Sequence, residues 1–406
     1  MQTRFTFQPN TSIIEPIQIA KKLRPLLQQH ADEAEQAGKI PDVVFDAIQK
    51  SGLFLMMAPR RFGGYGCKII THMQTIAELA KGCAGSAWAF GLLSGCSGAA
   101  TAMAKESTDL IFKTGKELLC SVSGLMGTAT PTKGGYIVNG KWGYASGCMH
   151  ADWALNGVKV LDSNGTTIDT AFAAIPLINN PNVSIQNTWN VLGVKASGSN
   201  TVIAEDLFIP KELLMLASAA PTSEYLLTLE ELEPRERMPV EPLFPLGVLS
   251  PTLGSVMAMQ EYVKKQMIEK KIVGWNYPTQ SESHTYVKLF GEATMEIDSA
   301  WLHIERAAKM LDETAQETPL TGYDKARIQA DSGYAMQQIR NAGNKLMDIA
   351  GPSGFSDSSP MQRYWRDLSF ASRHSALNSP LSLELYGRAE LDLPSNIALL
   401  PNIKNH

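Results

Sequence analysis

The spacing of Gly135, Gly140 and Lys141 matches the G-x-x-x-x-G-K pattern of a loop that binds nucleotide phosphates. Trp142 stands where that pattern needs a Ser or Thr for Mg²⁺, and the surrounding glycines predict a hairpin rather than a strand-to-helix loop. The G-x-G at Gly64–Gly66 has no third glycine in place, so a dinucleotide-binding fingerprint is also absent. The seven histidines are scattered, which argues against a metal centre. The chemistry must therefore come from other side chains.

The composition excludes several classes of protein. The 406 residues carry 36 Lys and Arg against 40 Asp and Glu, a net charge of −4, without any basic run. This balance argues against nucleic acid as a partner, because binding phosphates needs a basic excess or patch. A hydrophobic content of 44% argues against disorder. The five cysteines form no C-x-x-C pair, which is typical of reduced thiols in a cytoplasmic protein.

One segment is long enough to cross a membrane. Residues 82–104 contain no charged side chain, and the segment lies between Lys81 and Lys105. Its five glycines and three serines lower its hydropathy, so we expect a buried helix of small residues in a tightly packed bundle. The N-terminus lacks the apolar core of a signal peptide. We therefore expect a soluble, cytoplasmic protein.

Hydrophobic periodicity predicts helices at both ends of the chain and strands between them. Near the N-terminus, a helix should begin at Pro41 and end at Ser51-Gly52, and near the C-terminus Ala335–Ile349 repeats at steps of four and three. In the middle, turn-forming pairs separate short apolar runs. The turn pairs are Gly134-Gly135, Asn139-Gly140 and Asn164-Gly165, and the runs are Tyr136–Val138, Trp153–Val160, Thr170–Leu177 and Thr201–Pro210.

We expect four parts: an N-terminal helical domain (residues 1–117), a middle β domain (118–214), an insertion (215–245) and a C-terminal helical bundle (246–406). The insertion carries five prolines and an acidic cluster. It is interpreted equally well as a solvated connector or as a lid over a ligand.

A set of local motifs occurs in a specific order along nearly the whole chain, roughly residues 15–393. Each motif is weak alone, but their order and spacing together are fairly specific. They are Pro59–Gly64, Gly85–Trp88, Gly134–Tyr136, Gly140–Cys148, His150–Trp153, Trp189, Gly193–Ser199, Gly351–Gly354, Arg363–Asp367, His374 and Tyr386–Arg388. This pattern resembles the acyl-CoA dehydrogenase fold and, more closely, its oxygenase branch, the two-component (group D) flavin-dependent monooxygenases.

The resemblance implies an N-terminal helical domain, a β-barrel-like middle domain and a C-terminal four-helix bundle, usually assembled as a homotetramer. It also implies that a separate NAD(P)H flavin reductase supplies reduced flavin, FAD or FMN, to this chain. Oxygen would then form a C4a-(hydro)peroxyflavin that hydroxylates or epoxidises a small indole-type or phenolic substrate. N- or S-oxygenation is a variant of the same chemistry. The pocket should exclude water and hydrogen-bond flavin N5.

The same resemblance implies roles for individual residues. Ser146 matches the position beside flavin N5, and His374 is the candidate acid/base or substrate anchor, while Ser121 and Ser123 would present hydroxyls to the substrate. Structural roles remain open for each: a strand-end hydroxyl, a helix histidine paired with a carboxylate, and ordinary strand residues. The remaining candidates would contact the flavin, with β-domain core or helix termination as the alternative. They are Trp142, Tyr144, Ala145, Trp189, Ser197, Ser199, Gly351 and Gly354.

Two features bear on the choice of reaction. The alternative function, acyl-CoA dehydrogenase, needs a carboxylate base near the C-terminus, but Arg373–Asn378 contains none and Glu384 reads as a helix-surface residue. Many relatives that hydroxylate phenols carry a histidine in the small-residue helix, whereas this chain has Ser94, Cys96 and Ser97 there. Substrates less acidic than a phenol, such as indoles, therefore become more plausible. A stretch at residues 264–271 offers only lysines for the flavin phosphate, which leaves FMN or FAD open.

Overall fold

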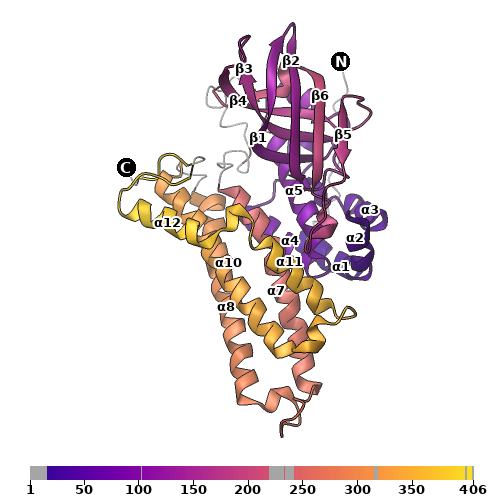
Figure 1. The fold of residues 1–406 in the computed structure, drawn as a ribbon, viewed down its shortest axis with the longest axis vertical. Coiled ribbons are helices and arrows are strands. Elements are labelled where there is room, and N and C mark those ends of the chain that lie inside the picture. Colours follow the sequence, from indigo (N-terminus) through magenta and orange to yellow (C-terminus); the bar gives the residue numbers. More distant parts are fainter. Residues whose placement is uncertain are drawn as a thin grey trace.

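The computed structural model describes residues 16–101, 103–218, 233, 242–314, 319–397 and 400–404. A β-sheet lies at one end, N-terminal helices lie below one side of it, and long C-terminal helices extend away from it (Figure 1). Most of the predicted insertion, 219–232 and 234–241, lies outside the described residues. The helix–β–helix order predicted from the sequence is confirmed.

The N-terminal helices surround one buried helix, α5 (Ala84–Ala100). Its glycines permit close helix contacts, since a Cβ on Gly98 would lie 2.7 Å from Met57 Cβ and one on Gly91 would lie 2.8 Å from Ile76 Cδ1. The prediction of a buried small-residue helix is thus confirmed. The other helices are α1 (Pro16–Gln29), α2 (Ala31–Ala37), α3 (Asp42–Ser51), α4 (Ile69–Ala80) and α6 (Lys105–Ile111), with 3₁₀ turns at Leu53–Leu55 and Arg60–Phe62.

The middle of the chain forms a seven-stranded sheet of order β5-β6-β2-β1-β3-β4-β7. Among the strands that the structure describes, β1 and β3 alone pair in parallel, and a register shift between Val122 and Gly127 interrupts that pairing. The strands are β1 (Leu119–Thr132), β2 (Gly135–Ala145), β3 (Trp153–Leu161), β4 (Thr167–Pro176), β5 (Val183–Gln186), β6 (Asn200–Pro210) and β7 (Leu214–Leu216), with 3₁₀ turns at Lys195–Ser197 and Lys211–Leu213.

One predicted turn is wrong. Asn139-Gly140 does not end a strand, because β2 runs through it and pairs with both β1 and β6. Gly140 is needed there for space: a Cβ would lie 2.4 Å from the Trp142 ring, and one on Gly127 would lie 2.2 Å from it. The other two turn pairs do separate strands, β1 from β2 and β3 from β4.

The C-terminal helices form the bundle. The α10 residues Ala335–Ile349 place their apolar repeat in the core, as predicted. Helix α7 is long and apolar enough to cross a membrane, but its most apolar window is 72% buried, as in a core helix. The helices are α7 (Leu243–Glu269), α8 (His284–Lys309), a π turn (Met310–Thr314), α10 (Gly322–Ala350), α11 (Pro360–Ala371) and α12 (Ser379–Glu390), with 3₁₀ turns at Gln280–Glu282, Pro352–Phe355 and Ser375–Leu377.

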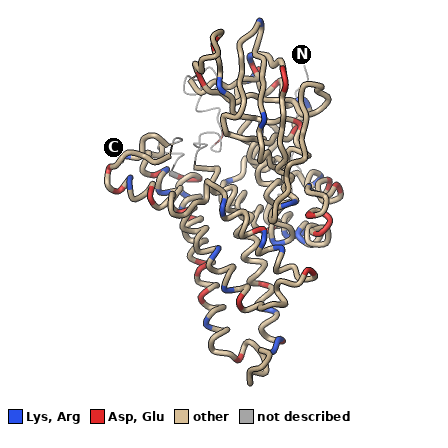
Figure 2. The backbone as a smooth tube through the Cα atoms, viewed as in Figure 1, with Lys and Arg blue, Asp and Glu red and all other residues tan. Residues whose placement is uncertain are grey.

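Charges of both signs are interspersed over the molecule, without a region of one sign in the view of Figure 2. The five cysteines are unpaired, and Cys83, Cys120 and Cys148 are buried. Burial raises the pKa of the thiols of Cys67, to about 11, and of Cys96 and Cys148, to about 12.

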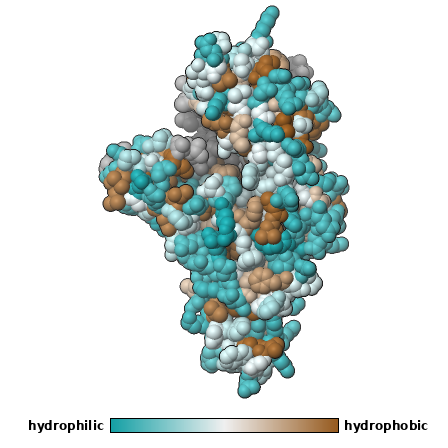
Figure 3. Space-filling model, in the orientation of Figure 1, coloured by the Kyte–Doolittle hydropathy of each residue, from teal (hydrophilic) through white to brown (hydrophobic). Residues whose placement is uncertain are grey.

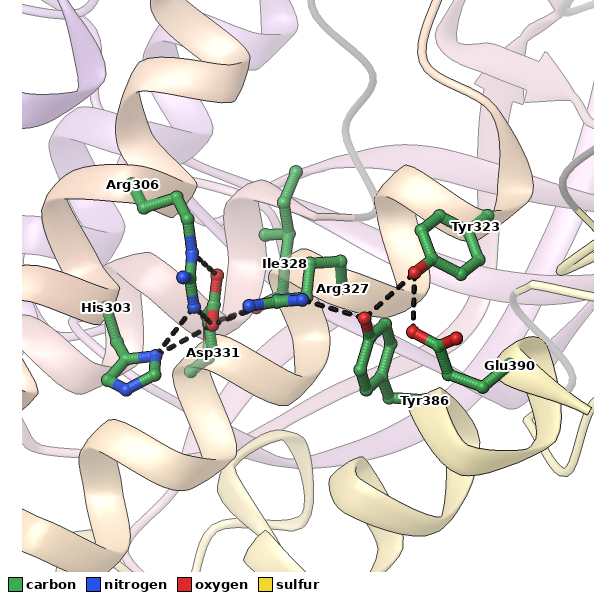
Figure 4. A network of polar contacts seen from close by, with 9 residues as sticks. His303, Arg306, Tyr323, Arg327, Ile328, Asp331, Tyr386 and Glu390 are labelled. Carbon is green, nitrogen blue, oxygen red and sulfur yellow. Dashed lines mark hydrogen bonds and ion pairs between the residues drawn. The ribbon is translucent and has the colours of Figure 1, made fainter.

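A polar network joins α8, α10 and α12 at one end of the bundle (Figure 4). The buried carboxylate of Asp331 accepts from Arg306, from Arg327 Nε at 3.4 Å and contacts His303 Nδ1 at 2.9 Å. Arg327 also donates to Tyr386 Oη at 2.7 Å, and that hydroxyl lies 2.8 Å from Tyr323 Oη. The network fixes the α12 end of the bundle.

We expect Asp331→Asn to lower the free energy of unfolding by about 1–3 kcal/mol, because it removes the carboxylate that neutralises Arg306 and Arg327. Both arginines are partly exposed and keep some hydration, which limits the loss. Urea unfolding measures the effect. Asp109→Asn, in the exposed Lys105–Asp109 pair, is the control and should change stability by less than about 0.5 kcal/mol. Equal effects of the two variants would contradict the prediction.

Candidate functional site

Trp88 on α5 connects two residues that the sequence singles out. Its Nε1–H donates to Ser146 Oγ at 3.1 Å, and its ring centroid lies 5.9 Å from that of His374. Trp88 is 6% exposed and Ser146 is 7% exposed, so the contact is made away from bulk water. The structure therefore brings together a strand-end hydroxyl and a C-terminal imidazole through an indole that sequence reasoning did not assign to the site.

The backbone turns sharply where Ser146 leaves β2. Tyr144 has φ +63° and Gly147 has φ +79°, left-handed conformations that reverse the chain. Gly147 N–H then donates to Ser197 O at 2.9 Å, which joins this turn to the segment before β6. The left-handed backbone at Tyr144, a bulky residue, marks the kind of local strain found at functional sites.

Two more predicted serines lie behind Ser146. Ser146 Oγ is 2.7 Å from Ser199 Oγ, which is 2.7 Å from Ser197 Oγ. Both outer serines are buried, at 2% and 1% exposure. The sequence predicts flavin contacts for Ser197 and Ser199, and the structure places both hydroxyls in the interior behind Ser146.

The turn that carries these serines is held from α11. Val194 has φ +48°, and its N–H donates to Asp367 Oδ1 at 2.6 Å across 173 residues of sequence. Burial raises the pKa of Asp367 to about 6. The neighbouring Arg366 binds Glu35 and donates to Leu192 O at 2.7 Å. These contacts fix the turn against the bundle that also carries His374.

His374 follows α11 and caps the 3₁₀ turn Ser375–Leu377, where its Nδ1 accepts the Ala376 N–H at 3.2 Å. A neutral imidazole with Nδ1 as the acceptor carries its proton on Nε2, so we infer this tautomer. Burial lowers the pKa of His374, which favours the neutral form at pH 7, and no charged group contributes to that shift. Phe244 packs edge-on to the ring at 5.5 Å. His374 thus presents an N–H donor in an aromatic setting.

The alternative reaction needs a carboxylate base to remove an α-proton, and Glu384 is the carboxylate that the sequence offers near His374. Glu384 lies on α12, is 46% exposed and binds Arg388 four residues on. Among the described residues, Glu384 is thus held in an ion pair at the helix surface, as the sequence predicts.

Aromatic side chains line the outer side of the serine turn. Tyr144 is 74% exposed and meets the Trp189 ring edge-on at 5.6 Å, and Trp189 meets Phe370 at the same separation. Trp189 also borders a groove formed with the end of α2 and the residues before β6. The groove is lined by Glu35–Gly38, Met149, Ile185, Asn187, Trp189–Val191, Lys195 and Asn200.

Several predicted residues lie elsewhere. Trp142 is fully buried and donates to Gly157 O at 2.8 Å, so it packs in the sheet core and does not wall a ligand, and Ala145 is fully buried beside it. Ser121 Oγ donates to Leu155 O at 2.5 Å, whereas Ser123 is exposed on β1 beside the register shift. Neither serine has a hydrogen bond to the Ser146 cluster.

Gly351 and Gly354 lie at the opposite end of α11 from His374, because the helix separates them. Lys270, from the predicted lysine stretch, donates to Ala350 O and Ser353 Oγ, each at 2.6 Å. The end of the lysine stretch thus contacts the glycine loop. Within one chain, both lie at the end of α11 that is farther from His374.

We expect His150, which follows the serine turn in sequence, to make the free energy of unfolding depend on pH. Its ring stacks on Phe45 at 4.6 Å, its Nε2 is buried without a hydrogen bond, and burial lowers its pKa to about 4. In the unfolded chain the pKa of His150 is near 6.5, so the unfolded state binds the proton more tightly than the folded state. The free energy of unfolding therefore falls as the pH drops from about 6.5 toward 4.

The variant His150→Phe keeps the ring packing but cannot bind the proton. Between pH 7.5 and pH 5, we therefore expect the free energy of unfolding to fall by about 2 kcal/mol less in this variant than in the unsubstituted protein. Urea unfolding at the two pH values measures this difference. Parallel losses in both proteins would show that His150 does not titrate as a buried group.

Comparisons with known proteins agree with the fold. The acyl-CoA dehydrogenase N-terminal domain family model matches residues 18–109, and the C-terminal domain model matches residues 250–379. The oxygenase subunit HsaA of a flavin-dependent monooxygenase from Rhodococcus jostii is 27% identical over 92% of this chain and 97% of its own length. The oxygenase component of p-hydroxyphenylacetate 3-hydroxylase from Acinetobacter baumannii is 26% identical over 94% and 90%.

Solved structures share the fold. XiaF from Streptomyces sp., in complex with FADH2 and glycerol, has a TM-score of 0.89 and 28% identity, covering 94% of this chain and 96% of its own. Indole-bound TdsC from Paenibacillus sp. A11-2 has a TM-score of 0.80 at 19% identity, covering 96% and 99%. The second likeness concerns the fold alone.

Proposed function

Because the chain belongs to the oxygenase components of two-component flavin-dependent monooxygenases, within the acyl-CoA dehydrogenase fold, we propose that it oxygenates a small aromatic substrate beside Trp88. The observation that carries this proposal is the contact of one buried indole with both Ser146 and His374. A hydroxyl and an imidazole N–H are thereby held near one another in an aromatic, largely dry environment.

The residues present fit a flavin. Ser146 offers a buried hydroxyl for a ring heteroatom, and the exposed Tyr144 ring with Trp189 offers apolar surface for the ring system. Reduced flavin, when bound, supplies the electrons that activate O2. The chain lacks a nicotinamide fingerprint, so a separate reductase must deliver that flavin. FADH2 is bound in XiaF and FMN in TdsC, and we leave both forms open for this chain.

His374 is assigned the substrate-facing role. Its Nε2–H can donate to an oxygen or nitrogen of the substrate, and the rings of Trp88 and Phe244 favour a flat aromatic partner. Cys96 occupies the helix where phenol-hydroxylating relatives carry histidine, and burial raises the pKa of its thiol to about 12. The lack of a histidine in the α5 sequence itself favours an indole-type substrate over a phenol. One relative is named indole-3-acetate monooxygenase.

We further propose a cytoplasmic homotetramer. Three features support this: unpaired cysteines suit a reducing compartment, α8 exposes Met295 and Leu302, and the Gly351 loop lies away from Ser146. Apolar patches interrupt the polar surface of the helical part in Figure 3, as expected of faces that a partner covers. In such an assembly the Gly351 loop and Lys270 would meet the flavin of a neighbouring subunit.

Anaerobic stopped-flow mixing tests the function. The protein is mixed with reduced FAD or FMN and then with oxygenated buffer, with and without indole or a phenol. We expect bound flavin to reoxidise more slowly than free flavin, and an oxygenated product to form with the substrate. Reoxidation at the free rate without product would contradict the proposal. Tightly bound oxidised FAD that acyl-CoA bleaches would instead identify a dehydrogenase.

A further inference from the structure

A small cavity of about 60 Å³ lies between α10 and the C-terminal half of α11. Pockets for ligands with a ring system are several times larger, about 300–1,000 Å³, so this cavity suits one small head group. Its lining combines two arginines with polar and apolar side chains, and none of the described residues that line it is acidic. They are Arg340, Asn344, Trp365, Leu368, Ser369 and Arg373.

Arg340 is the lining residue that the fold itself does not explain. Its side chain is partly buried, and it makes no hydrogen bond or ion pair within the part of the chain that the structure describes. Burial and the positive charge of Arg373 both lower the pKa of Arg340. Polar groups taken out of water are normally paired with an acceptor, so the five N–H donors of this guanidinium remain open to a ligand.

The other polar groups of the cavity are also donors. Asn344 Oδ1 accepts the Trp365 Nε1–H at 3.2 Å. Because an indole N–H can only donate, this contact fixes the carboxamide and leaves Nδ2 as its remaining, donating group. Arg373 Nη1 donates to Ser369 O, which leaves the other N–H groups of that guanidinium. The Ser369 hydroxyl has no partner among the described residues and can donate as well.

The charges in the cavity favour a dianion. Both guanidiniums stay protonated at pH 7, and the lining offers no carboxylate to neutralise them. A phosphate group carries about −1.5 to −2 charges at pH 7 and has three acceptor oxygens, which matches two cations. A carboxylate has one charge and would leave one guanidinium unneutralised. Arginine also binds phosphate through two parallel N–H groups, a geometry that lysine cannot offer.

We propose that the cavity between α10 and α11 is a phosphate-binding site, in which Arg340 and Arg373 clamp the phosphate while Asn344 and Ser369 donate to its oxygens. The phosphate is a free ion or the phosphate monoester of a flavin such as FMN, since both present the same oxygens. Binding of inorganic phosphate does not depend on oxygenase activity, so it is tested separately from the proposed function.

Calorimetric titration of inorganic phosphate into the flavin-free protein tests the site, with the ionic strength held constant by chloride. We expect Arg340→Gln to raise the dissociation constant for phosphate at least about tenfold, because hydrogen bonds to charged groups are the strong ones. Arg340→Lys keeps the charge without the planar fork and should lie between the two. Arg388→Gln removes an arginine from an ion pair on α12 and, as the control, should bind phosphate like the unsubstituted protein.

Thermal unfolding separates binding from a structural role of Arg340. In phosphate-free buffer, Arg340→Gln should unfold at the same temperature as the unsubstituted protein or at a higher one, because it loses no partner and relieves the repulsion from Arg373. Added phosphate should raise the midpoint of the unsubstituted protein and leave that of the variant unchanged. A variant that is less stable without phosphate would assign a structural role to Arg340 and overturn the proposal.

A second titration identifies the source of the phosphate. Reduced FMN is compared anaerobically with reduced riboflavin, which lacks the phosphate. If Arg340→Gln weakens FMN but not riboflavin, the occupant is the flavin phosphate. If it weakens inorganic phosphate and neither flavin, the occupant is the free ion. If the affinities for inorganic phosphate and FMN are both independent of Arg340, the proposal is wrong. Phosphate binding through Arg340 in a protein that binds no flavin would support this site while the proposed function fails.

Discussion

His374→Ala is expected to lower the rate of product formation by about 10²–10³-fold, within the range for loss of one positioned proton donor. The affinity for reduced flavin should change little, because Ser146 and Tyr144 remain. Nε2–H is the group lost, since Nδ1 already accepts the Ala376 N–H. Product formed per turnover of reduced flavin, measured in single-turnover mixing, tests this.

His374→Gln separates two roles of the imidazole. Glutamine keeps an N–H donor but cannot gain a proton, so a residue that only donates a hydrogen bond should retain activity within about tenfold. Because burial lowers the pKa of His374, activity of the unsubstituted protein should be flat near pH 7. It should fall only when acid protonates the ring. A Gln variant as inactive as Ala would instead assign proton transfer to His374.

Ser146→Ala is expected to uncouple oxygen consumption from product formation. Most of the consumed O2 should appear as hydrogen peroxide, with product yield reduced at least about tenfold, because removing one positioned hydrogen-bond partner in a dry site commonly costs 10²–10³ in rate. The alanine also leaves Trp88 Nε1–H unpaired, so some stability is lost. Peroxide and product are quantified together in one reaction.

Ser146→Thr serves as the matched control because it keeps the hydroxyl, and it should restore most of the coupling. The loss of folding stability in the alanine variant is measured separately by urea unfolding. Ser146→Ala with normal product yield would show that this hydroxyl does not protect the reaction.

The helices were predictable because local patterns determine them. The α10 repeat from Ala335 to Ile349 is buried, and the α3 helix ends where Ser51-Gly52 predicts, with Gly52 in the left-handed conformation. Asn139-Gly140 has the sequence of a turn but lies within strand β2, because β1 and β6 both pair with it. The Trp142 ring also fills the space beside Gly140. Tertiary pairing overrode local propensity there.

The site was predicted only in part. The hydroxyls of Ser146, Ser197 and Ser199 do come together, but Trp142 was assigned to the flavin and lies in the core because its ring faces β3. Trp88 belongs to a motif that predicts only the start of a helix, and nothing local indicates that its N–H meets a residue 58 positions away. The anchor from Asp367 to Val194 joins residues 173 positions apart and requires the folded bundle. Such long-range contacts leave no periodic signal in sequence.

The buried cysteines bear on how long the protein survives its own reaction. An oxygenase releases some hydrogen peroxide, which oxidises thiolates far faster than thiols. Because burial raises the pKa of Cys96 and Cys148 to about 12, both thiols are far less ionised at pH 7 than an ordinary exposed thiol. Burial thus keeps both thiols in the protonated form, which hydrogen peroxide oxidises slowly.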